Sequence, residues 1–295
     1  MRRHKRKELE AAREQPPRSA TGMMNGRARP LVLCYHAISD AWRDALSVSP
    51  AVFERQVRTV LQRGYRPAAT AETVAARGKL VHVTFDDAFR SVSRALPALE
   101  RLGVPATVFA CPGLADGAEP FAVPELPAET GEHADELATM GWDELRGLVE
   151  RNIEVGSHTL THPHLTTLGD YELRRELEVS RERLEDHLGV RCRFLAYPYG
   201  EEDERVRAAA RSSGYEAAFA LPGRQGSIDI YAVPRVGIWR EDGSVRVSVK
   251  TSQAGRRLLA QPLNSARERW PRLARRREPL VEGGGSKPQV TNQSG

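Results

Sequence analysis

Two neighbouring aspartates and a group of histidines are the residues of this sequence whose types and spacing could do chemistry. Asp86 and Asp87 directly follow the apolar run LVHVTF, and adjacent carboxylates in such a place repel each other unless a positive group lies nearby. His158 and His162 are four residues apart, which can place both imidazoles on one side of a single turn. Two histidines and one aspartate form a three-ligand set that leaves room on a cation for water and substrate. The pattern therefore predicts a catalytic metal site, in which one aspartate binds the cation and the other remains available as a base.

Other interpretations of the same residues stay open at this point. One aspartate could cap a helix that starts near Ala88, although this would leave the second carboxylate unexplained. The histidines could belong to a surface loop, since an HxxxH spacing alone is weak evidence. Pro163 restricts His162 to the end of any helical turn. His164 has a spacing that suits neither face, and we do not expect it to be a ligand.

The polar residues stand where predicted strands end. His36 follows the run LVLCY, the aspartate pair follows LVHVTF, His158 follows IEVGS, and a Tyr-Pro-Tyr-Gly loop (197–200) follows CRFLA. In parallel α/β folds, functional sites are built at the carboxyl ends of the strands. We therefore expect these four segments to form one constellation.

Alternation of short apolar runs with amphipathic stretches predicts a parallel sheet covered by helices, as an open sheet or as a barrel. The expected strands are 31–36, 80–87, 106–111, 153–158, 192–200 (a strand with its exit loop), 215–221 and 232–238. The expected helices are 49–64, 91–103, 142–152, 170–189 and 202–214. The stretch 112–140 is rich in Pro, Gly and acidic residues and reads as a surface insertion, either a functional lid or a variable excursion.

Charge divides the chain of 295 residues into a core and two tails. Residues 1–29 and residues 251–295 each carry nine Lys or Arg against three Asp or Glu, so that the net charge of +5 arises from the ends. We expect residues 30–250 to form one domain and both basic tails to be largely disordered. Contact of the tails with anionic surfaces is compatible with their charge, but a nucleic-acid partner is not expected.

The sequence contains no apolar run of membrane-spanning length, and its basic start lacks the apolar segment of a secretory signal. Three widely spaced cysteines, Cys34, Cys111 and Cys192, lie in or beside apolar runs and are expected to be buried free thiols. Together these features predict a cytoplasmic protein without a disulfide framework.

Several motifs, taken in order, resemble those of the polysaccharide deacetylases of the NodB-homology class. The resemblance is carried by TFDD (84–87), SHTLTHPHL (157–165) and FLAYPYG (194–200), accompanied by YH (35–36), MGWDEL (140–145) and PRVGI (234–238). It covers roughly residues 30–250 and implies a deformed, TIM-like (β/α) barrel of about seven strands. The implied activity is metal-dependent hydrolysis of N-acetyl groups from the amino sugars of a polysaccharide or oligosaccharide, with release of acetate.

The resemblance assigns roles to individual positions. Asp87, His158 and His162 would bind a divalent metal ion, with Zn²⁺ as the expected ion, and Asp86 would be the catalytic base. The backbone N–H of Tyr199 would face the oxyanion. The chemistry agrees with this assignment, because a divalent ion polarises a carbonyl and lowers the pKa of a bound water, while a backbone donor stabilises the tetrahedral oxyanion.

Two departures from the common family pattern affect the remaining roles. No histidine follows His187, although most members place their general acid late in the domain. Some members instead carry an early YH, and we therefore assign the general acid to His36. Ala196 stands where many members have an arginine directed at the base. Arg193 or Arg235 could replace that arginine, and Arg235 is the better candidate.

Two alternative functions follow from the same observations. The insertion 112–140 could close over a small molecule, which would fit a hydrolase of small non-peptide amides similar to allantoinase. The missing late histidine would fit a catalytically weak, sugar-binding pseudoenzyme. The complete set of metal positions argues against the pseudoenzyme, and the metal set, the base and the YPYG loop together favour a deacetylase acting on a carbohydrate substrate.

Overall fold

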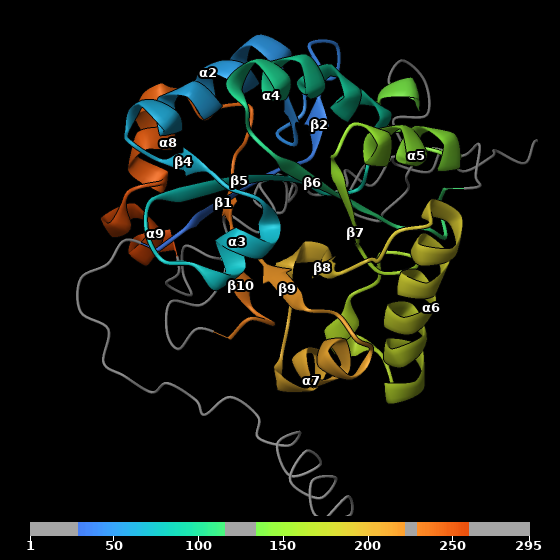
Figure 1. Ribbon diagram of the computed structural model, residues 1–295. Coiled ribbons are helices and arrows are strands. Elements are labelled where there is room, and N and C mark those ends of the chain that lie inside the picture. The colour runs from blue at the N-terminus through green and yellow to red at the C-terminus, as the bar shows by residue number, and fades with distance from the viewer. Residues whose placement is uncertain (1–28, 116–133, 222–228, 260–295) are drawn as a thin grey trace, which may run out of the picture.

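The computed structural model describes residues 29–115, 134–221 and 229–259, which form a ring of parallel strands surrounded by helices (Figure 1). The strands around the ring follow the order β10-β9-β8-β7-β6-β5-β1-β11. Their bounds are β1 (Leu31–Tyr35), β5 (Leu80–Phe85), β6 (Ala106–Ala110), β7 (Glu154–Ser157), β8 (Phe194–Ala196), β9 (Ala217–Ala220), β10 (Val233–Pro234) and β11 (Val236–Gly237). A short strand, β4 (Arg66–Pro67), pairs with β5 outside this path, and β2 (Ala37–Ile38) pairs with β3 (Ser47–Val48) in a separate sheet.

One short segment brings the two edges of the sheet together. β10 pairs in parallel with β9, whereas β11 pairs in parallel with β1, with Val236 opposite Leu33. Only Arg235 separates β10 from β11, so the chain passes from one edge of the sheet to the other at this residue. The predicted deformed (β/α) barrel is thereby confirmed, with the segment around Arg235 serving as its seventh strand.

Helices cover the outside of the ring (Figure 1). Their bounds are α2 (Pro50–Gln62), α3 (Thr70–Ala75), α4 (Leu96–Leu102), α5 (Trp142–Glu150), α6 (Asp170–Leu188), α7 (Glu204–Ser212), α8 (Ser244–Lys250) and α9 (Gln253–Leu259). Short 3₁₀ segments are η1 (Arg90–Ala95), η2 (Ala134–Glu136), η3 (Leu165–Thr167) and η4 (Pro198–Gly200). Local sequence explains the ends of several helices: the Ser49 side chain accepts the Val52 N–H at the start of α2, and Gly189 ends α6 in a left-handed conformation.

Two apolar layers fill the domain. The outer layer lies between strands and helices and includes Leu33 of β1, Val83 of β5 and Leu177 of α6. The inner layer fills the barrel interior with mainly aromatic and small side chains: Val32, Phe109, Phe194, Ala196, Ala217 and Phe219. Alternation along each strand therefore directs one set of residues outward and the other inward. The inward set ends in polar residues at the carboxyl edge of the strands.

Most predicted elements are present, and the differences have physical reasons. The expected helix 91–103 divides into η1 and α4, with Pro97 in the first turn of α4, where its missing N–H is tolerated. The expected strand 232–238 is interrupted at Arg235. The helix α9 extends to residue 259, within the segment predicted to be a tail. Residues 1–28, 116–133 and 260–295, and thus most of the tails and of the insertion, lie outside the described residues, so the domain division stays a prediction.

The three cysteines are buried free thiols, as predicted. Among the described residues, no helix is both long and apolar enough to cross a membrane.

Candidate functional site

The predicted site residues lie together at the carboxyl edge of the barrel. His36 follows β1, Asp86 and Asp87 follow β5, His158 follows β7, and Tyr199 lies in η4 just after β8. β1 pairs directly with β5, and the strands β5, β6, β7 and β8 are consecutive neighbours in the ring. Because these strands are parallel, all four segments lie at the same edge of the sheet, at the carboxyl ends of the strands.

The three predicted metal ligands converge. One ligand atom from each of Asp87, His158 and His162 lies within 4.8 Å of the other two, and all three residues are buried. The Nε2 atoms of His158 and His162 lie 3.5 Å and 3.4 Å from the Asp87 Oδ1 atom. This geometry places two imidazoles and one carboxylate around a common point.

The donor set fits a divalent cation. The Nδ1 atom of His158 lies 2.8 Å from the Ala196 carbonyl oxygen, which can only accept, so Nδ1 carries the proton and Nε2 presents a lone pair. The Asp87 Oδ1 atom that faces this lone pair has no hydrogen-bond partner among the described residues. Two electron-rich atoms that face each other in a buried site repel, and a cation between them removes the repulsion. Metal-binding histidines usually donate a hydrogen bond from the ring nitrogen that does not bind the metal, and His158 Nδ1 makes such a bond to the Ala196 carbonyl.

Burial acts on the titration of all three residues. It lowers the pKa of the His158 and His162 imidazoles below the ordinary value, so both are neutral and able to act as ligands near neutral pH. Burial, together with the neighbouring charge of Asp86, raises the pKa of Asp87. A bound cation would offset this cost by favouring the ionised carboxylate.

The second aspartate, Asp86, is bound by an arginine. Arg235 donates from Nη1 to Oδ1 at 2.6 Å and from Nη2 to Oδ2 at 2.8 Å. Burial alone would raise the Asp86 pKa, but the charge and hydrogen bonds of Arg235, together with the nearby His158 and His36, outweigh burial and hold the pKa well below its usual range. Asp86 is therefore ionised. Of the two arginines considered from the sequence, Arg235 takes this position, whereas Arg193 pairs with Glu216 at 2.7 Å.

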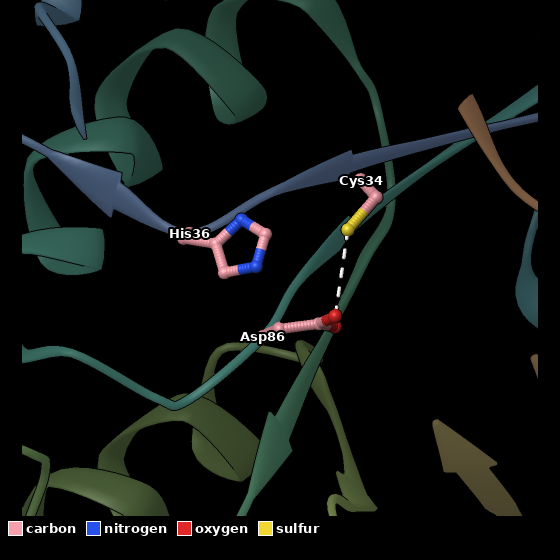
Figure 2. Close-up of side chains that lie close together, drawn as sticks. All are labelled: Cys34, His36 and Asp86. Atoms are coloured by element: carbon pink, nitrogen blue, oxygen red, sulfur yellow. Dashed lines mark hydrogen bonds between the residues drawn. The ribbon is translucent and has the colours of Figure 1, made fainter. Parts of the chain in front are cut away.

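His36 lies beside Asp86, in a second group of side chains next to the three predicted ligands (Figure 2). One ligand atom each of Cys34, His36 and Asp86 lies within 4.8 Å of the others, and the Cys34 thiol donates to Asp86 Oδ2 at 3.4 Å (Figure 2). The His36 ring stacks on Trp239 with 5.5 Å between ring centroids. Burial lowers the His36 pKa to about 4, and its Nδ1 atom has no hydrogen-bond partner in the described part of the chain.

Tyr199 borders the imidazole pair. Its ring meets His162 edge-on at 4.8 Å between centroids and stacks on His164 at 3.8 Å. The Nδ1 atom of His164 is hydrogen-bonded to Glu201 Oε2 at 3.0 Å, and His164 is not among the three converging ligands. His164 thus fixes the ring of Tyr199, whose backbone N–H is expected to donate to the oxyanion.

Unusual backbone conformations concentrate at this edge. Six non-glycine residues of the described chain have positive φ, and only Asn152 of the six lies away from the site; the others are Asp87, Ala88, Thr159, His162 and Tyr199. Such conformations cost about 1–3 kcal/mol each and persist where surrounding contacts over-determine them. The helical segment after the aspartates begins at Arg90 with Phe89 as its cap residue and no side-chain cap. The capping interpretation of the aspartate pair is therefore wrong.

Sequence reasoning missed three contributors to the site. Cys34 donates to Asp86, Trp239 covers His36, and the buried Glu176 accepts hydrogen bonds from the loop between the two imidazoles. Cys34 could have been found, because it stands two residues before His36 and shares its strand face. Trp239 and Glu176 come from remote elements with no distinctive spacing, so no sequence signal pointed to them.

Comparisons with known proteins agree with this geometry. The family model described as Polysaccharide deacetylase matches residues 73–218, which include the aspartate pair, the histidine loop and the AYPYG segment. YxkH of Bacillus subtilis (strain 168), which is named as a polysaccharide deacetylase, is 23% identical over 217 residues, or 70% of each chain. Chitin deacetylase 1 of Cryptococcus neoformans var. grubii is 41% identical over 61 residues, which cover 21% of this chain but only 13% of that protein.

Solved structures share the fold. BC0361, a polysaccharide deacetylase from Bacillus cereus, superimposes with a TM-score of 0.60 at 25% identity, over 75% of this chain and 68% of that chain. The Streptococcus pyogenes deacetylase PplD, solved in complex with acetate, gives a TM-score of 0.62 at 19% identity, over 76% of this chain and 98% of that chain. Motifs, fold and family match thus agree: residues 73–218 match the polysaccharide deacetylase family, whose members are hydrolases that act on carbon–nitrogen bonds other than peptide bonds.

Proposed function

We propose that this protein removes N-acetyl groups from amino sugars of a polysaccharide or oligosaccharide, and that it uses a divalent metal ion, with Zn²⁺ as the expected ion. The observation that carries the proposal is the convergence of Asp87, His158 and His162 beside the ionised Asp86. Three ligands leave coordination positions open, as in catalytic rather than structural zinc sites. A buried base next to an open ligand set is the arrangement that amide hydrolysis requires.

Asp87, His158 and His162 would hold the ion. When bound there, a divalent ion lowers the pKa of a coordinated water toward about 7 and polarises the substrate carbonyl. The neutral imidazoles and the partnerless Asp87 oxygen described above are suited to this task.

The remaining residues orient the reactants and move protons. Asp86 accepts a proton from the attacking water, and Arg235 keeps its carboxylate ionised and fixed in direction. The Tyr199 N–H donates to the oxygen that gains charge in the tetrahedral state, and a donor of this kind is worth about 3–4 kcal/mol. The amine must be protonated to depart, and His36 is the group assigned to this step.

The resting state of His36 constrains the order of proton transfers. With a pKa of about 4, its imidazole is neutral near neutral pH and has no surplus proton to give. The proton therefore has to reach it during turnover. Asp86 lies close to His36 and receives the water proton, so transfer from Asp86 to His36 supplies the acid for the second half of the reaction.

The position of His36 also weighs against a pseudoenzyme. That alternative was motivated by the missing late histidine, and an imidazole beside Asp86 supplies the missing group from the start of the chain. A carbohydrate substrate is supported by the family match and by the relatives named above, two of which are a chitin deacetylase and a deacetylase solved with acetate.

The test is acetate release by the purified Zn²⁺-loaded protein from N-acetylglucosamine oligomers, with chelator-treated protein as the control. We expect release that chelation abolishes and Zn²⁺ restores. Metal-loaded protein that releases no acetate from any such oligomer would contradict the proposal. Turnover of allantoin or related ureides in the same assay, without acetate release, would establish the small-amide alternative instead.

A further inference from the structure

A buried glutamate on α6 holds the loop that joins the two imidazoles. The Glu176 carboxylate accepts the backbone N–H groups of Leu160 and Thr161 at Oε2, each at 2.9 Å. Its Oε1 atom accepts the Thr161 hydroxyl at 2.7 Å. Glu176 is only 7% exposed, although it stands in the middle of a helix whose other acidic residues are all less buried.

No basic side chain compensates the buried charge of Glu176 within the described residues: none forms an ion pair with it, and its carboxylate contacts are the three hydrogen bonds to the loop. A carboxylate removed from water is costly unless hydrogen bonds replace its hydration. Hydrogen bonds to a charged acceptor are also stronger than neutral ones, about 1.5–3 kcal/mol each. The hydrogen bonds of the Glu176 carboxylate therefore fix the positions of Leu160 and Thr161.

These two residues stand midway between His158 and His162. His158 is fixed from the strand side, because its N–H donates to the Ala110 carbonyl and its ring to the Ala196 carbonyl. His162 belongs to no helix or strand, and its position depends on the path of the loop. The hydrogen bonds of Glu176 therefore act on the part of the site that the barrel itself does not fix.

The loop also needs an external restraint because it is strained. Thr159 and His162 have φ values of 70° and 65°, in the left-handed region that β-branched residues in particular avoid. A conformation of this kind relaxes when its surroundings allow it. The carboxylate opposes relaxation at the residues between the two strained positions.

We propose that Glu176 is a positioning residue that sets the separation of the His158 and His162 imidazoles and thereby the metal affinity of the site. The inference rests on the metal site proposed above. Glu176 does not contact the metal or the substrate; it acts through the backbone N–H groups of Leu160 and Thr161. Truncation of its side chain leaves all three ligands in the chain and keeps the bonds of Leu160 to the Glu176 backbone carbonyl and to the Gly113 N–H, but it removes the contacts at Thr161, which directly precedes His162.

The experiment compares Glu176→Ala, Glu176→Gln and Glu182→Ala, the last being an exposed glutamate on the same helix. Zn²⁺ affinity is measured by competition with a chromophoric chelator, and Co²⁺ absorption reports the geometry around the ion. Unfolding of each metal-free protein is measured in parallel. These readouts do not depend on catalysis, so they can be obtained before any substrate is known.

We expect Glu176→Ala to weaken Zn²⁺ binding about 10–100-fold and to change the Co²⁺ spectrum, as loss of an outer contact to metal ligands typically does. Glu176→Gln should recover most of this loss, because an amide oxygen can accept both N–H groups and the amide N–H₂ can donate to the Thr161 hydroxyl. Glu182→Ala should match the wild type.

Two failures are distinguishable. A wild-type protein that binds neither Zn²⁺ nor Co²⁺ would overturn the proposed metal-dependent function. A wild type that binds metal and a Glu176→Ala variant with unchanged affinity and spectrum would overturn only the role of Glu176. If Glu176→Ala does not fold, Thr161→Val decides: it removes the hydroxyl bond to Glu176 Oε1 alone, and unchanged Zn²⁺ affinity with an unchanged Co²⁺ spectrum in this variant contradicts the inference.

Discussion

Arg235 binds both carboxylate oxygens of Asp86, at 2.6 Å and 2.8 Å, and the side chains of both residues are almost completely buried. The arginine comes from the short segment between β10 and β11 that closes the barrel, and the aspartate follows β5. The contact therefore joins the closing segment to the proposed catalytic base.

Replacement of Arg235 by Met should destabilise the protein by about 3–5 kcal/mol at neutral pH, because it leaves a buried charge without its partner. The Asp86 pKa is depressed in the folded wild type, so the stabilisation is present above its ordinary value of 3.8 and is lost as the pH falls through the folded-state pKa. The gap between variant and wild type should consequently narrow in acid. Urea unfolding at several pH values measures this difference in unfolding free energy. The control is Arg58→Met, which removes an exposed ion pair on a helix and should cost at most about 1 kcal/mol.

The two aspartates should separate metal binding from turnover. Asp86→Ala is expected to abolish acetate release while the protein retains its metal, because Asp86 is assigned to proton transfer. Asp87→Ala should lose the metal, because it removes the only carboxylate among the three converging ligands. Elemental analysis of the purified variants decides the matter, and loss of metal with Asp86→Ala but not with Asp87→Ala would reverse the two assignments.

His36→Gln should lower kcat by about 10²–10⁴-fold, the usual contribution of a general acid, with little change in metal content. The reason is that His36 lies beside Asp86 and outside the group of three ligands. Steady-state kinetics on a defined oligomer measure the effect. Retention of full kcat by this variant would show that another group protonates the amine.

Gly200→Ala should be far more harmful than Gly189→Ala. Both glycines have a φ of +67°, so both substitutions carry the strain of a left-handed residue, about 1–2 kcal/mol. A Cβ on Gly200 would lie 2.1 Å from the Leu221 carbonyl oxygen, whereas a Cβ on Gly189 would meet nothing within 4 Å. Gly200→Ala should therefore displace the Tyr199 loop and reduce activity as well as stability. Equal unfolding free energies for the two variants would contradict this account.

A buried histidine at the opposite end of the barrel should make stability depend on pH. His82 bonds through Nε2 to the hydroxyls of Thr70 and Thr107, at 3.1 Å and 2.9 Å, and burial lowers its pKa from 6.5 to about 4. The neutral form is favoured in the folded state, so its stabilisation is complete above pH 6.5 and declines as the pH falls toward about 4. The decline in the free energy of unfolding that is attributable to His82 is of the order of 3 kcal/mol.

Urea unfolding of wild type and of His82→Gln across this pH range isolates the contribution of His82. The variant should show a flatter pH dependence, whereas His187→Gln, at an exposed position, should follow the wild type. Parallel pH profiles for wild type and His82→Gln would show that burial of this imidazole does not govern acid stability.

The strand–helix alternation was sufficient to predict a parallel sheet with polar residues gathered at its carboxyl edge, whereas the barrel form was predicted from the family resemblance. His36, the aspartate pair and His158 each follow the end of a strand. Because the strands pair in parallel, their carboxyl ends lie at the same edge of the sheet. The guess that Arg235 faces the base also agrees with the structure. These inferences succeed because local pattern and topology determine them.

Tertiary packing determined what could not be predicted. The segment SVRVSVK alternates polar and apolar residues as a strand would, yet it forms α8, with Val247 buried and Val245 and Val249 exposed. Glu176 looks like any acidic residue on a polar helix, and only the approach of the histidine loop gives it a role. Such residues depend on contacts between elements distant in sequence, which periodicity does not record.

The guanidinium of Arg256 donates to the carbonyl oxygens of Arg29 and Pro30, at 3.3 Å and 3.0 Å, so the chain enters and leaves the described fold at neighbouring points. These points lie before β1, whose five residues span about 16 Å to the reactive edge. A tether attached at residue 29 would therefore leave the described fold on the side of the barrel away from the proposed site.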